Sequence, residues 1–98
     1  MTSADRLVRV NAGTLHRELQ GEGVLLQLDT GEYFGLDAIG ERMWTLLAEY
    51  GRVATVHAHL LEEFDVDAET LSRDLAELVD EFIRRRLLDE ASGPAAAP

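Results

Sequence analysis

Two periods of apolar spacing divide this chain into a first half that predicts strands and a second half that predicts helices. Residues 24–28 are apolar apart from Gln27, and their branched side chains suit a pleated surface, which predicts a strand. Residues 29–32 predict a tight turn, because aspartate favours its first position and Gly31 tolerates a positive φ. Residues 33–36 then return as an antiparallel strand.

Upstream of this hairpin the pattern is weaker but still favours strands. Residues 7–10 are compatible with a short strand, and residues 14–20 favour a longer one, which residues 21–23 connect to the hairpin as a turn. The sequence therefore predicts a three-stranded antiparallel meander with the Tyr33 strand at one edge.

The first predicted helix covers residues 38–49. Asp37 is a good N-cap, because its carboxylate can accept from the free N–H groups of the first turn. Glu41 adds a negative charge near the positive end of the helix dipole. Gly51 follows the last apolar position and predicts the C-terminal end.

Two further helices are predicted, at residues 53–64 with Thr55 as a candidate cap, and from residue 68 to about 86 with Asp67 as the cap. The apolar positions at helical spacing in the three helices are Ile39, Met43, Leu46, Leu47, Val56, Leu60, Leu61, Phe64, Leu71, Leu75, Leu78, Val79, Phe82 and Ile83. Residues 87–88, both leucine, are expected to fold back on the sheet or to complete the core.

The order of elements predicts an α+β fold class, in which a three-stranded antiparallel sheet is followed by three helices in a winged-helix-like arrangement. At 98 residues the chain predicts a single domain, which we place at residues 1–90. Residues 91–98 are low in complexity and predict a disordered tail, and residues 1–6 are expected to be loose.

The charge argues against one class of function for this fold. The net charge is −10, the sequence pI is about 4.5 and there is no lysine, whereas nucleic-acid binders neutralise phosphates with clustered basic side chains. The run at residues 84–86, three arginines, is explained by a helix C-terminus that complements its dipole. The composition indicates a protein or peptide partner and no nucleic acid.

The sequence offers no residues for catalysis, a metal or a cofactor. There is no cysteine, so disulfides, thiolate ligands and a cysteine nucleophile are excluded, which suits the cytoplasm. His57 and His59 point to different sides of a helix, and His16 is isolated, so we expect no metal site. No glycine-rich phosphate loop, membrane span or signal peptide is visible. We therefore expect a protein that is not an enzyme and uses no cofactor.

The edge strand is the candidate binding surface. It contains no proline or lysine and one charge, so its free N–H and C=O groups can pair with an added peptide strand. Phe34 and Leu36 are assigned to the core, as is Trp44, whereas Tyr33 faces the other side of the sheet. The third helix forms the second wall, where two acidic residues are candidates to pair with a basic peptide residue. The predicted peptide-binding residues are Glu32, Tyr33, Phe34, Gly35, Leu36, Leu71, Asp74, Leu75, Glu77 and Leu78.

The stretch from strand to first helix also resembles the PqqD-like family, the leader-peptide recognition modules of ribosomal peptide biosynthesis. The family pattern is an aliphatic strand, T-G-x-Y-[YF]-x-L-[ND], a small residue, an aliphatic, Gly, and a Trp before two leucines. Its positions here are Thr30, Gly31, Tyr33, Phe34, Leu36, Asp37, Ile39, Gly40, Trp44, Leu46 and Leu47. The resemblance continues at residues 63–67 and 87–88 and covers roughly residues 14–90.

This resemblance implies a winged-helix-like fold and recognition of the leader segment of a precursor peptide. A free-standing acidic chain of this size is most similar to the leader-binding partner of lasso-peptide biosynthesis, where a cysteine protease and an ATP-dependent cyclase carry out the chemistry. The alternatives are a partner of a radical enzyme, as in pyrroloquinoline quinone biosynthesis, a winged-helix DNA-binding regulator, which conflicts with the charge, and a structural dimerisation domain. For the edge strand at residues 32–36, the alternative to peptide binding is that the chain's own tail or a dimer partner covers this edge.

Overall fold

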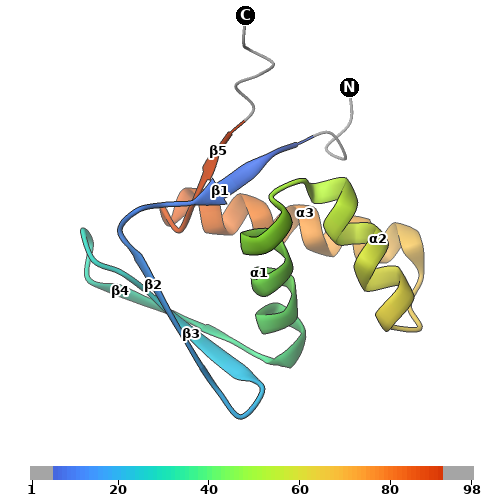
Figure 1. Ribbon diagram of the computed structural model, residues 1–98, viewed down its shortest axis with the longest axis horizontal. Coiled ribbons are helices and arrows are strands. Elements are labelled where there is room, and N and C mark those ends of the chain that lie inside the picture. Colours follow the sequence, from blue (N-terminus) through green and yellow to red (C-terminus); the bar gives the residue numbers. More distant parts are fainter. Residues whose placement is uncertain (1–5, 92–98) are drawn as a thin grey trace, which may run out of the picture.

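Three consecutive strands form an antiparallel meander in the computed structural model, which describes residues 6–91 (Figure 1). The strands are β2 (Thr14–Leu19), β3 (Glu22–Gln27) and β4 (Glu32–Leu36), with β3 in the centre. The turn before β3 lies at Gln20 and Gly21, which both have a positive φ. Residues 22–23, which we expected in that turn, therefore belong to β3.

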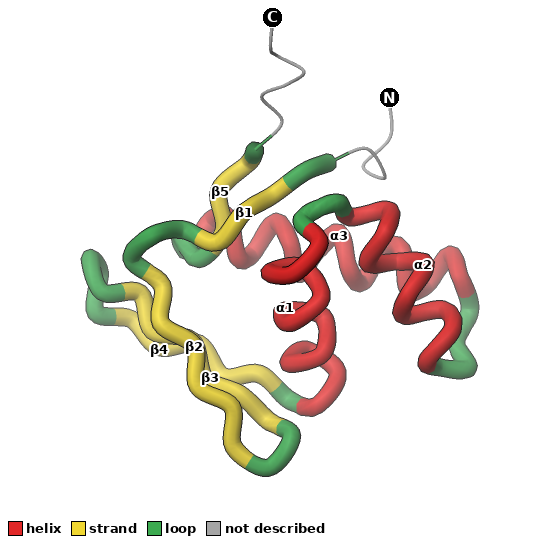
Figure 2. The backbone as a smooth tube through the Cα atoms, in the orientation of Figure 1, coloured by secondary structure: helices red, strands yellow, loops and turns green. Residues whose placement is uncertain are grey.

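Three helices follow the meander and lie together beside it: α1 (Ala38–Tyr50), α2 (Val53–Glu63) and α3 (Ala68–Arg84) (Figure 2). Two predicted caps are confirmed, since Asp37 accepts from the Gly40 N–H at 2.8 Å and Asp67 accepts from the Thr70 N–H at 2.9 Å. The predicted cap Thr55 is wrong, because α2 begins after Arg52 and has no side-chain cap. The predicted α+β fold class is confirmed.

A second, two-stranded sheet joins the two ends of the described chain. β1 (Val8–Val10) pairs antiparallel with β5 (Leu88–Glu90), a strand that the sequence did not predict. Arg6, which we expected to be loose, donates to Asp80 at 2.8 Å and to Glu90 at 2.7 Å. Residues 1–5, and residues 92–98 of the predicted disordered tail, lie outside the described part of the chain.

The core lies between the inner face of the meander and the helices. Trp44 is buried, as predicted, and its ring packs edge-to-face on Phe82 at 5.2 Å between centroids. Ile39 is an exception to the predicted stripe of α1, because its side chain is exposed. The buried apolar residues are Val8, Leu25, Leu36, Met43, Trp44, Leu46, Leu47, Val53, Val56, Leu60, Leu71, Leu75, Val79, Phe82, Leu87 and Leu88.

Candidate peptide-binding site

Strand β4 presents two different faces, as its sequence predicts. Tyr33 is 71% exposed on the outer face, whereas Leu36 is buried on the inner face. Phe34 is half-buried on the inner face, with its ring edge-to-face against Phe82 at 5.5 Å between centroids. Phe34 therefore links the edge strand to α3.

The hydrogen bonds of the hairpin identify the backbone groups that β4 leaves free. The Gln27 carbonyl accepts from the Gly31 N–H at 2.7 Å, whereas the N–H of Leu28 points the other way and donates at 2.8 Å to the carbonyl of Gly13, the residue before β2. Gln27 thus directs its backbone polar groups toward β4, and its partner in the register is Glu32. Because these groups alternate along a strand, residues 32, 34 and 36 bond to β3, and Tyr33 and Gly35 point outward. No described strand pairs with that outer edge.

The end of α3 lies across from the start of β4. The Arg85 guanidinium carbon lies 5.2 Å from the centre of the Phe34 ring. Its Nε donates to Glu81, and its Nη1 lies 3.8 Å from a carboxylate oxygen of Glu32. Hydrogen bonds from Arg85 and Arg84 lower the pKa of the Glu81 carboxyl. The sequence pattern gave no reason to place Arg85 beside β4, because the run of arginines at the helix end is explained by the helix dipole.

A buried glutamine fixes the end of α3 to the sheet. Gln27, 1% exposed, donates from Nε2 to the Arg86 carbonyl at 2.5 Å, and its Oε1 accepts from the Asp29 N–H at 2.7 Å. The carbonyl of Leu87 accepts from the Thr14 hydroxyl at 3.1 Å. These bonds tie the residues that follow α3 to β2 and β3.

The predicted residues on α3 divide into three groups. Leu71 and Leu75 are buried in the core at 6% and 1% exposed, and therefore present almost no surface to a ligand. Leu78 is half-buried against the core, whereas Asp74 and Glu77 are exposed. The α3 residue that contacts Phe34 of β4 is Phe82, which lies C-terminal to all of the predicted α3 residues.

The prediction that His16 is isolated is wrong. Its Nε2 lies 2.8 Å and 2.9 Å from the two carboxylate oxygens of Glu41, which is buried in the first turn of α1. A Cβ at position 23 would lie 1.9 Å from Glu41 Oε1, so Gly23 makes room for this carboxylate. His57 contacts the Ala68 carbonyl instead, and the described residues contain no cluster of three or more possible metal ligands.

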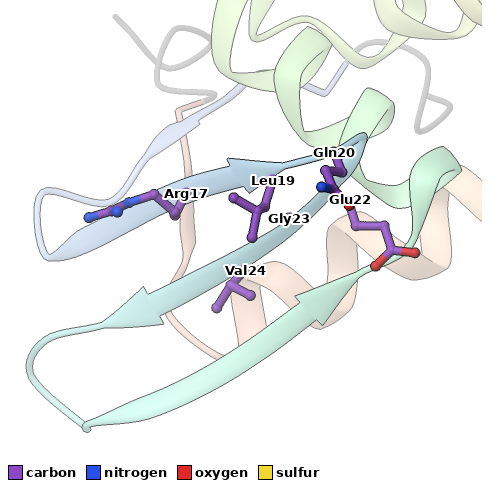
Figure 3. A pocket seen from close by; sticks show the side chains of 6 residues that line it. All are labelled: Arg17, Leu19, Gln20, Glu22, Gly23 and Val24. Atoms are coloured by element: carbon purple, nitrogen blue, oxygen red, sulfur yellow. The ribbon is translucent and has the colours of Figure 1, made fainter.

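The outer face of the meander carries two shallow hollows of about 330 Å³ each. Figure 3 shows the one near the β2–β3 turn, with Arg17, Leu19 and Val24 on adjacent strands. The second is lined by residues that include Leu15 and Tyr33. Tyr33 is the one β4 residue that lines either of these hollows, and strand addition at the β4 edge uses backbone groups and needs no deep pocket. None of the described helices has the length and apolar character that crossing a bilayer requires.

The model of a known protein family matches this chain, in which a three-stranded meander lies beside three helices. That family is described as coenzyme PQQ synthesis protein D (PqqD), and the match covers residues 22–88. The chain belongs to this family, and the predicted resemblance is confirmed.

Two solved structures are similar to this chain. One is TbiB1 in complex with the TbiA(beta) leader peptide, which is 36% identical, has a TM-score of 0.79, and matches over 83% of this chain and 94% of that one. The other is a lasso peptide synthetase B1 complexed with the leader peptide, at 23% identity, a TM-score of 0.74, and 83% and 95% coverage, which shows the same fold. A search of curated proteins gave no match.

Proposed function

We propose that this chain binds the leader segment of a ribosomally made precursor peptide by strand addition to β4. The observation that carries the proposal is the similarity to TbiB1, which was solved with a leader peptide and matches 83% of this chain at 36% identity. The free backbone groups of Tyr33 and Gly35 support the place of binding, because an added strand takes its affinity from such groups. Phe34 and α3 form the second wall.

The chain itself is proposed to be non-catalytic. We assign the chemistry to separate enzymes, a cysteine protease and an ATP-dependent cyclase of a lasso-peptide pathway, to which this chain presents the precursor. A net charge of −10 without lysine supports a peptide partner over nucleic acid.

An amide NMR titration tests the binding site. The probes are synthetic peptides that cover candidate leaders from the open reading frames that neighbour this chain's gene, and a scrambled peptide of the same composition is the control. We expect the largest shifts at residues 32–36 and on the side of α3 that faces them. Shifts confined to β2 or α2 would place the site elsewhere.

Mass spectrometry tests the absence of catalysis. Incubated with this chain alone, the precursor is expected to keep its mass. With the partner protease present, the chain is expected to increase the rate of leader removal. Cleavage or modification by the purified chain alone would contradict the proposal.

A further inference from the structure

Arg85 is a cation placed where α3 meets the proposed edge for strand addition. Its side chain is 40% exposed, and its guanidinium lies over the Phe34 ring of β4. The ring face attracts the cation and holds the planar group beside the edge strand. In a chain with net charge −10, Arg85 is a cation at the start of β4, where the carboxylates of Glu81 and Glu32 flank it.

The guanidinium retains donors that the protein does not use. Its Nε donates to Glu81 on the preceding turn of the helix. The distance from Nη1 to Glu32 is 3.8 Å, which is an ion pair but too long for a hydrogen bond. Within residues 6–91 neither terminal nitrogen donates a hydrogen bond, so the two-pronged edge of the group remains available.

The helix period places Arg85 in line with two residues of the predicted site. Asp74 precedes Arg85 by 11 residues, which is about three helical turns, so the two side chains leave the helix axis in directions that differ by about 20°. Leu78 lies between them on the same stripe. At about 1.5 Å per residue, Leu78 lies about 10 Å from Arg85 and about 6 Å from Asp74 along the axis. Phe82, which borders this stripe, contacts Phe34 of β4, so the stripe lies beside the part of α3 that meets the edge strand.

We propose that Arg85 is a specificity-determining residue that receives a carboxylate side chain of the bound leader. This inference rests on the proposed strand addition to β4. A guanidinium binds a carboxylate through two parallel hydrogen bonds, and the charge makes each stronger than a neutral one. The leader therefore carries an acidic residue opposite the Glu32 end of β4 and an apolar residue opposite Leu78.

The test pairs charge changes on both partners. The probes are peptides of the leader encoded beside this chain's gene, with each Asp and Glu replaced in turn by Asn or Gln, or by Lys. Fluorescence anisotropy measures their affinity for the wild type, Arg85→Gln, Arg85→Glu and the control Arg84→Gln. Arg84 also pairs with Glu81, so its replacement makes the same charge change beside the site.

One leader carboxylate is expected to pair with Arg85. Neutralising it should weaken the binding of the peptide to the wild type and to Arg84→Gln about tenfold, whereas Arg85→Gln should bind the native and the neutralised peptide equally well. Arg85→Glu should bind the peptide with Lys at that position more tightly than the native leader. If every neutralised peptide binds the wild type as the native leader does, or if the loss persists in Arg85→Gln, the assignment is wrong. No binding of any leader peptide to the wild type would instead refute the proposed function.

Discussion

Replacing Gly35 by proline tests strand addition at a single backbone atom. The Gly35 N–H points away from β3, so Gly35→Pro removes an outward donor without breaking a bond of the meander. Phe34→Pro is the contrasting change, because the Phe34 N–H points toward β3 and its ring packs on Phe82. We expect Phe34→Pro to destabilise the fold and Gly35→Pro to spare it.

The expected loss of affinity follows from one backbone hydrogen bond. Such a bond contributes about 1 kcal/mol, which corresponds to about fivefold in Kd. The proline ring also stands where the added strand approaches, so fivefold is the lower limit.

Gly35→Ala is the matched control for this prediction. A Cβ at position 35 would meet no atom within 4 Å, and alanine keeps the N–H, so this variant is expected to bind the leader with nearly the wild-type Kd. Isothermal titration calorimetry gives the Kd of the leader for the wild type, Gly35→Pro and Gly35→Ala, and urea unfolding tests whether the two variants remain folded. A Gly35→Pro variant that is folded and binds with the wild-type Kd would refute strand addition at this edge.

Three further substitutions and one assay of the unchanged protein have expected outcomes. Gly23→Ala should lower the free energy of unfolding by about 1–3 kcal/mol in urea melts, because the new methyl group displaces the buried Glu41 carboxylate from its contact with His16. Hydrogen bonds from Thr70 lower the pKa of the Asp67 carboxyl. The stability that the ionised Asp67 contributes is therefore present above about pH 4 and is lost as the pH falls through the lowered pKa. Asparagine is an N-cap that does not titrate, so in Asp67→Asn the loss of stability that comes from protonating Asp67 should disappear from acid unfolding curves. Asp74→Arg should change the free energy of unfolding by less than about 0.5 kcal/mol and weaken leader binding in the same calorimetric assay. The protein should not retard duplex DNA in a gel-shift assay at physiological salt. A retardation that depends on salt would contradict the assignment of a peptide ligand.

The sequence alone determined the features that depend on neighbouring residues. The meander, the caps Asp37 and Asp67 and the αL end of α1 at Gly51 were predictable, because alternation, capping and turn chemistry act over a few residues. The opposite faces of Tyr33 and Phe34 follow from the same local geometry, and so does the position of the edge strand.

Tertiary structure decided which distant residues meet. β1 and β5 pair across about 80 residues of chain, and neither short segment is a convincing strand without its partner, so the sequence pattern did not reveal the pairing. The same holds for the contact of His16 with Glu41. On α3 the apolar stripe was predictable, but helical spacing does not say which element covers each part of it. Packing buried Leu75 and turned the end of the helix toward Phe34, and this placed Arg85, rather than a leucine, beside the open strand.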